Sequence, residues 1–320
     1  MQKKKIISIV SGCWNEVENI PVFYERCIAE LARHPEYDYE FVIADNLSTD
    51  GTREVLRQIA GKDPKFKVIF NSANLGHIRS PFNALMQSGG DLIFYICSDL
   101  QEPPEMLGDF LKQYEAGFDI VCGVKPKSKE NFFMFQIRKF YYHLLSGCSD
   151  VAQIRNFTGF GLYDKKVIEA LKKFHDPYPY FRGLVSEIGF KRCEVPFVQD
   201  KRKFGETKNN FFTLYDMAMT GFVNHTKLPL RLAVFSGFFI AFLSLLVALG
   251  YFLYKCFNWY DFQVGMAPLV IGLFFFSAVQ LIFIGILGEY IGAIYTQVKN
   301  KPLVIEEERI NFDKNESANK

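Results

Sequence analysis

The sequence predicts an α/β domain built on a mostly parallel sheet, followed by a transmembrane hairpin. Short apolar runs alternate with helix-like patterns between residues 5 and 124, which is typical of βαβ units. Two later runs, 232–254 and 262–288, contain no charged residue. Each exceeds the roughly 20 residues that a helix needs to cross a bilayer. A chain of 320 residues has room for both parts.

The expected elements follow one another without long interruptions. Strands are predicted at 6–10, 39–44, 66–71, 92–97 and 120–124. Helices are predicted at 17–32, 50–60 and 78–88. The first run follows three lysines, as in a signal peptide, but it is short, rich in β-branched residues and followed by acidic residues rather than a cleavage site. We therefore interpret it as the first strand.

Composition excludes several classes of protein. The seven cysteines are odd in number, scattered and without a Cys-x-x-Cys pair, so neither a disulfide framework nor a zinc site is indicated. This pattern favours a reducing cytosol around the polar part of the chain. The net charge of +2 is small, and no nucleic-acid-binding motif occurs, so nucleic acid is not an expected partner.

Polar residues follow the predicted strands at the points where the strands end. The fourth apolar run ends in Asp99, with Gln101 two residues later, and the second ends in Asp45. In open α/β sheets ligands bind beyond the carboxyl ends of the strands, and Mg²⁺ or Mn²⁺ prefers oxygen ligands. Asp99 taken alone is equally consistent with a helix N-cap. Asp45 is placed to accept hydrogen bonds from a ribose or a base.

These loops together resemble a known family. The resemblance rests on Asn-Glu at 15–16, Asp-Asn-Leu-Ser-Thr-Asp-Gly-Thr at 45–52, Asn-Leu-Gly at 74–76 and Ser-Asp-Leu-Gln-Glu-Pro-Pro at 98–104. In this order they resemble the family 2 glycosyltransferases, which have the GT-A fold. Four later motifs narrow the resemblance to the polyprenyl-phosphate glycosyltransferases, such as bactoprenol glucosyltransferases and dolichol-phosphate mannose synthases. These motifs occupy 157–162, 180–184, 202–208 and 288–292.

The resemblance implies three groups of site residues. The catalytic residues would be Asp99, Gln101 and Arg202, with Asp99 and Gln101 holding Mg²⁺ or Mn²⁺. The nucleotide sugar would be bound by Asn15, Glu16, Asp45, Gly76, Ser98 and Asp99. The phosphates of donor and acceptor would meet the basic residues Lys125, Arg138, Arg202 and Lys208. Guanidinium and ammonium groups beside a flexible loop are suited to closing over phosphates.

The chain departs from the family pattern at the expected metal site. Members usually carry an acidic residue two positions before the metal-binding Asp, and here that position is Cys97. A neutral thiol is a poor ligand for a hard cation, so we expect a weaker metal site. Asn46 stands where a second Asp is frequent and Ser11 where Pro is frequent.

The expected organisation has four parts: a GT-A domain (1–210), an interfacial amphipathic helix (211–229), a transmembrane hairpin (230–292, with spans at about 232–254 and 266–288) and a tail (293–320). The tail from 306 is expected to be disordered because it is acidic and then mixed polar. Basic residues flank the hairpin on the side of both termini, which predicts that the termini and the catalytic domain face the cytosol at the inner membrane.

The predicted activity is inverting transfer of a sugar from a nucleotide sugar, with UDP-glucose as first guess, to undecaprenyl or dolichyl phosphate at the bilayer surface. Three alternatives stay open: a different donor (UDP-GlcNAc, a UDP-4-amino-arabinose derivative or GDP-mannose), a glycan or glycolipid acceptor, and a catalytically weak membrane partner that binds lipid phosphate. Association of copies through the transmembrane helices also stays open.

Overall fold

The computed structural model describes residues 4–125, 154, 156–174, 176, 179–199, 228–257, 266–299 and 301–312. The chain divides into two compact units, one built on a β-sheet and one containing two long apolar helices.

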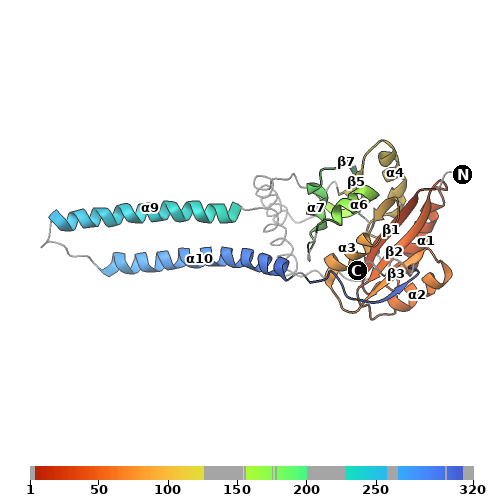
Figure 1. Ribbon diagram of the computed structural model, residues 1–320, viewed down its shortest axis with the longest axis horizontal. Helices are drawn as coiled ribbons and strands as arrows, with labels where there is room; N and C mark the ends of the chain where they lie inside the picture. The colour runs from red at the N-terminus through yellow and green to blue at the C-terminus, as the bar shows by residue number, and fades with distance from the viewer. Residues whose placement is uncertain are drawn as a thin grey trace. The chain divides into compact units, whose positions relative to one another are not determined.

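An eight-stranded sheet forms the centre of the first unit within the described residues (Figure 1). Its strands are β1 (Ile6–Cys13), β2 (Asp38–Asp45), β3 (Phe66–Asn71), β4 (Leu92–Tyr95), β5 (Ile120–Val124), β6 (Phe157–Asp164), β7 (Arg192–Pro196) and β8 (Glu306–Ile310). Their order is β7-β5-β6-β4-β1-β2-β3-β8. The pairs β4–β1, β1–β2, β2–β3 and β5–β7 are parallel, whereas β6 lies antiparallel between β4 and β5. The predicted α/β architecture with a mostly parallel sheet is confirmed.

Helices cover both faces of this sheet. They are α1 (Asn19–Leu31), α2 (Thr52–Lys62), α3 (Gly76–Met86), the 3₁₀-helix η1 (Pro104–Met106), α4 (Leu107–Glu115), α6 (Lys165–Leu171) and α7 (Phe181–Glu187). Apolar residues of α1, α2 and α4 belong to one core, and those of α3, α6 and α7 belong to the other. The parallel strands β1 to β4 are therefore buried on both sides, as βαβ crossovers require.

Strand alternation assigns residues to the two cores. On β2, Phe41 and Ile43 face the core with α1 and α2, whereas Val42 and Ala44 face the core with α3. All four are completely buried. Burying one such large apolar side chain contributes about 1.5–3 kcal/mol, so the near-continuous apolar strands supply much of the stability of the domain.

Strand β8 corrects one prediction from the sequence. Residues from 306 onward were expected to be disordered, but Glu306–Ile310 pairs antiparallel with β3 (Figure 1). The rule that predicts disorder from composition counts charged residues but does not consider which residues they pair with in the fold. Here β3 would otherwise be an open edge, and Arg57 of α2 pairs with Glu308 at 2.6 Å. Asn311 then fixes the end of β8 by donating to the carbonyl oxygens of Ala60 and Phe66. Residues 313–320 lie outside the described residues.

The second unit contains two apolar helices, α9 (Leu228–Phe257) and α10 (Met266–Val298), which contact one another. Within the described part of the chain, one helical segment, Gly272–Val298, is long and apolar enough to cross a membrane. Leu230–Ser244 of α9 is a shorter apolar segment. The span in α10 extends past the predicted end at 288, so Glu289 lies inside it.

Two predicted features are not covered. Most of the interfacial helix predicted at 211–229 lies outside the described residues, and its last two residues belong to α9. The connection between the two apolar helices, 258–265, also lies outside them.

Candidate active site

Hydrogen bonds join the loops that follow the four central parallel strands. Ser98, after β4, donates its hydroxyl to the carbonyl oxygen of Gly12 on β1 at 3.1 Å. Asn46 follows β2, and its side-chain amide donates at 2.8 Å to Oδ1 of Asn74, which follows β3. The predicted clustering of these loops at one edge of the sheet is therefore observed, because parallel strands end on the same side.

Three residues in these loops have a left-handed backbone although they are not glycine. Asn15 (φ 55°), Leu47 (φ 61°) and Leu100 (φ 60°) follow β1, β2 and β4. For Leu this conformation costs about 1–2 kcal/mol, so the surrounding contacts must hold it in place. Strained residues of this kind concentrate at functional sites, which favours this edge as the active site.

Asn15 and Glu16 connect the first two loops. The backbone N–H of Asn15 donates to Ser48 Oγ at 2.8 Å, and Asn15 Oδ1 accepts from the backbone N–H of Thr49, also at 2.8 Å. The backbone N–H of Glu16 donates to Thr52 Oγ1 at 2.9 Å. Both residues thus fix loop geometry, and their expected contact with a nucleotide sugar stays a prediction.

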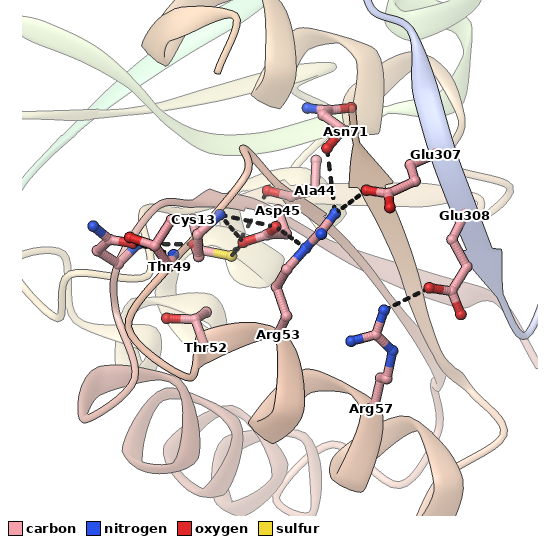
Figure 2. Close-up of polar contacts among 12 residues, drawn as sticks. Cys13, Ala44, Asp45, Thr49, Thr52, Arg53, Arg57, Asn71, Glu307 and Glu308 are labelled. Carbon is pink, nitrogen blue, oxygen red and sulfur yellow. Dashed lines mark hydrogen bonds and ion pairs between the residues drawn. The ribbon is translucent and has the colours of Figure 1, made fainter. Parts of the chain in front are cut away.

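Asp45 is completely buried, and its carboxylate is bonded within the protein (Figure 2). Its Oδ2 lies 3.0 Å from Arg53 Nε, and the backbone N–H of Ser48 donates to it at 3.2 Å. The second arm of Arg53 donates to Glu307 of β8 at 2.7 Å. Burial and the nearby Asp45 carboxylate raise the pKa of the Cys13 thiol, so Cys13 stays neutral. The predicted contact of Asp45 with ribose or base is untested.

Gly76 begins α3 with φ 79°, and no atom lies within 4 Å of where a Cβ would be. Backbone conformation rather than space therefore favours glycine there. Its carbonyl oxygen accepts from the side-chain amide of Asn46 at 3.2 Å.

Asp99 stands half-exposed just beyond the end of β4. Its Oδ1 accepts a 3.2 Å hydrogen bond from the backbone N–H of Gln101, so the two predicted metal ligands share one tight turn. Cys97, which stands where family members usually have an acidic residue, is exposed. Desolvation and the carboxylates of Glu102 and Asp99 raise the pKa of its thiol, so the neutral thiol is favoured.

Two residues not proposed from the sequence belong to this cluster, Glu102 and Arg182. Glu102 is buried and accepts hydrogen bonds from Cys97 N at 2.9 Å and Thr158 Oγ1 at 2.7 Å. Burial raises its pKa, opposed by these bonds and by Lys125. Burial also lowers the pKa of Lys125, a shift that Glu102 opposes and Arg182 reinforces. The sequence signals were the Gln-Glu-Pro-Pro and Tyr-Phe-Arg-Gly motifs that contain Glu102 and Arg182.

Arg182, at the start of α7, acts on several groups near the end of β4. Its positive charge lowers the pKa of His77, after the main effect of burial, and it opposes the raised pKa of Cys97. Burial lowers the pKa of Lys125, Arg182 lowers it further and the Asp99 carboxylate raises it, so Lys125 and Arg182 form a pair of cations that interact electrostatically. Such a pair is suited to neutralising phosphate oxygens.

The protein supplies few metal ligands in the part of the chain that the structure describes. No group of three or more His, Cys, Asp or Glu side chains there has the arrangement of a metal site. The other predicted phosphate-binding residues, Arg138, Arg202 and Lys208, lie outside the described residues.

Residues 8–182 match the family model described as glycosyl transferase family 2. This chain belongs to that family. The glycosyltransferase is 33% identical over 300 residues to the uncharacterized glycosyltransferase YkcC of Bacillus subtilis, covering 93% of this chain and 92% of the relative. It is 30% identical over 306 residues to the bactoprenol glucosyl transferase of Shigella phage SfII, covering 93% and 96%. The family predicted from the loop motifs is confirmed.

The mannosyltransferase PcManGT from Pyrobaculum calidifontis, solved in complex with GDP-Man and Mn²⁺, gives a TM-score of 0.48 at 13% identity. The match covers 94% of this glycosyltransferase and 89% of that chain.

Proposed function

We propose that this glycosyltransferase moves a sugar from a nucleotide sugar to a polyprenyl phosphate at a membrane surface. The observation that carries the proposal is that one chain combines two features: a strand end bearing Asp99, whose charge acts on Lys125, and an apolar helix long enough to cross a bilayer. Full-length similarity to a bactoprenol glucosyl transferase supports the acceptor. UDP-glucose is the first donor to test.

The acceptor needs little activation. A phosphate monoester has its second pKa near 6, so its oxygen is already ionised at neutral pH and no strong general base is required. The site must instead bring two anionic groups together and stabilise the departing nucleoside diphosphate. We assign this task to Lys125, whose ammonium group interacts with the charges of Asp99 and Arg182, and to Arg138, Arg182, Arg202 and Lys208.

The donor side is assigned to the loops after β1 to β4. Asn15, Glu16, Asp45, Gly76 and Ser98 lie in or beside these loops, and their mutual hydrogen bonds shape the edge that would receive the nucleotide. Because Asp45 is buried, its contribution in this structure is to hold the loop after β2 in place through Ser48.

A divalent cation fits this site in one specific way. Asp99 offers a half-exposed carboxylate, whereas the nearby Glu102 carboxylate is buried and already accepts two hydrogen bonds. Mg²⁺ is commonly bound by one or two carboxylates together with substrate phosphates. Asp99, with Gln101, would hold Mg²⁺ or Mn²⁺ against the donor diphosphate, where the ion supplies Lewis acidity for the leaving group.

The membrane arrangement is part of the proposal. We assign α9 and α10 to a two-span hairpin with both termini and the catalytic unit in the cytosol, following the basic residues Lys227, Arg231, Lys299 and Lys301. The hairpin would present the lipid phosphate to the catalytic unit at the bilayer surface.

The proposal is tested by nucleotide release from the purified full-length chain in lipid nanodiscs. The assay combines undecaprenyl phosphate and Mn²⁺ with UDP-glucose, UDP-GlcNAc, a UDP-4-amino-arabinose derivative or GDP-mannose in turn. One donor should give release that depends on the lipid, and Asp99→Ala should reduce it by at least about 100-fold, as loss of a main electrostatic stabiliser does. Full activity of the Asp99→Ala variant would refute the mechanism.

Other results would favour the alternatives. Release that requires a glycan or glycolipid instead of undecaprenyl phosphate would indicate the elongating reaction. Binding of the lipid phosphate without release from any donor would indicate a catalytically weak membrane partner.

A further inference from the structure

A chain of ionic contacts leads from the C-terminal strand to the loop after β2. Glu307 Oε2 lies 2.7 Å from Arg53 Nη2, and Arg53 Nε lies 3.0 Å from Asp45 Oδ2 (Figure 2). Asp45 in turn accepts from the backbone N–H of Ser48 at 3.2 Å. Ser48 Oγ then accepts from the backbone N–H of Asn15. An exposed glutamate more than 250 residues away in sequence is thus connected to two loops of the active-site edge.

A bulge gives Glu307 this orientation. In the pairing of β3 with β8, Phe70 is opposite Glu308 and Asn71 is opposite Glu306, so Glu307 has no partner in the register. Consecutive side chains of a regular strand point to opposite faces. Here Glu307 and Glu308 both pair with arginines of α2, because the irregularity redirects one of them (Figure 2). Bulges often redirect a side chain next to an active site.

Glu308 and Arg57 form a matched pair on the same two elements. Arg57 lies one turn after Arg53 on α2, and its Nη2 is 2.6 Å from Glu308 Oε2. Both guanidinium groups also lie over the ring of Phe70, at 4.9 Å for Arg53 and 4.4 Å for Arg57. The two pairs differ in one respect that matters here: Arg53 reaches the buried carboxylate of Asp45.

Arg53 has a fixed geometry because three acceptors surround it. Besides the two carboxylates, the carbonyl oxygen of Asn71 accepts from its Nη2 at 3.3 Å. The Arg53 side chain is 17% exposed and that of Asp45 is 0% exposed, whereas Glu307 is 53% exposed. Removing the outer carboxylate therefore leaves this arm of the guanidinium with the longer bond to Asn71, and the core stays closed. An ion pair this exposed adds little to global stability, so its main effect is local.

We infer that Glu307 is a positioning residue for the donor side of the active site, acting through Arg53 on Asp45 and the loop 45–49. The part of the inference that concerns donor binding rests on the proposed function. The strand that follows the long apolar helix in sequence would thereby set the geometry of the nucleotide-binding loop.

The test compares Glu307→Gln with Glu308→Gln in the full-length protein. Hydrogen exchange of the Ser48 and Thr49 amides, which donate to Asp45 and Asn15, reports loop order without any ligand. Glu307→Gln should speed their exchange by roughly tenfold, whereas Glu308→Gln should leave it within about twofold of the unaltered chain. Glu307→Asp, which keeps the charge, should restore part of the protection. Equal exchange in the two Gln variants would overturn the inference.

Titration with UDP and with GDP gives the second measurement. Whichever nucleotide the unaltered chain binds should bind Glu307→Gln about tenfold more weakly, the size of effect seen when an outer partner of a binding residue is lost. Glu308→Gln should bind it normally. Faster loop exchange with unchanged nucleotide affinity would overturn the role in donor binding. If the unaltered chain bound neither nucleotide, the proposed function would fail, and hydrogen exchange alone would decide whether Glu307 orders the loop.

Discussion

The backbone N–H of Cys97 donates a 2.9 Å hydrogen bond to Oε2 of Glu102, and this contact closes the loop that carries Asp99. The other Glu102 oxygen accepts from Thr158 Oγ1 of β6 at 2.7 Å. Between Cys97 and Glu102, Leu100 has a left-handed φ of 60° and is fully buried. Glu102 therefore anchors a strained loop to the neighbouring strand, and Asp99 depends on that anchor for its position.

Replacing Glu102 with Ala should destabilise this loop and lower sugar transfer. Two partly buried donors would lose their acceptor, at a cost of about 2 kcal/mol in the free energy of unfolding. Thermal unfolding and nucleotide release measure the two effects. Glu102→Gln is the control, because its amide oxygen still accepts one of the two hydrogen bonds. An Ala variant with the Tm and activity of the unaltered chain would show that the anchor is dispensable.

Cys97→Asp should strengthen metal binding. A carboxylate two residues before Asp99 adds a second hard ligand, which should lower the Mn²⁺ concentration for half-maximal activity by roughly tenfold. Cys97→Ser is the control, because it introduces oxygen without charge and should leave that concentration nearly unchanged. If Asp and Ser gave the same Mn²⁺ dependence, position 97 would lie outside the coordination sphere.

Two glycines should respond to Ala in opposite directions. At Gly90 a Cβ would lie 2.8 Å from the backbone oxygen of Ile6 and 2.9 Å from the backbone nitrogen of Ser8, so Gly90→Ala must displace β1. At Gly61, inside α2, nothing lies within 4 Å. Gly61→Ala should raise stability by about 0.5–1 kcal/mol, whereas Gly90→Ala should cost roughly 2 kcal/mol or more. Thermal melts of both variants test this contrast, and a destabilised Gly61→Ala would contradict it.

Glu40 should make stability depend on acidic pH. Burial favours its neutral acid, but hydrogen bonds from Ser8, Lys67 and Gly89 outweigh burial, so the pKa of Glu40 is lowered. A carboxylate with a lowered folded-state pKa stabilises the protein above its unfolded pKa and loses that contribution as pH falls through the folded value. The Tm should therefore drop below pH about 4.5, the ordinary range for Glu.

Glu40→Gln provides the comparison for this pH dependence. At pH 7 the variant should be less stable by about 1–2 kcal/mol, because it loses the ionic bond to Lys67 at 2.9 Å. The difference in Tm between the two proteins should shrink on acidification. A difference that stayed constant between pH 7 and pH 3 would exclude Glu40 as the responsible group.

The local sequence pattern was sufficient to predict those strands whose own residues carry the apolar pattern. The strands at 66–71 and 120–124 agree with β3 and β5, and the residues after the strands were correctly expected at one edge. The fourth strand was predicted to run to 97 but ends at Tyr95. Cys97 instead takes part in the loop held by Glu102, because a hydrogen bond to a side chain replaces the sheet partner.

The family, the mostly parallel sheet and the position of Asp99 follow from the sequence itself, because strand periodicity and loop composition are local properties of the chain. The tertiary structure alone decided that the acidic segment from Glu306 is a strand and that Glu102, Arg182 and Arg53 belong around the site. Their significance depends on partners far away in sequence: Thr158 for Glu102, Lys125 for Arg182, and Glu307 for Arg53. Only folding brings such charged residues together. From the sequence alone, a charged side chain is expected to be exposed to solvent, because its partner is not known.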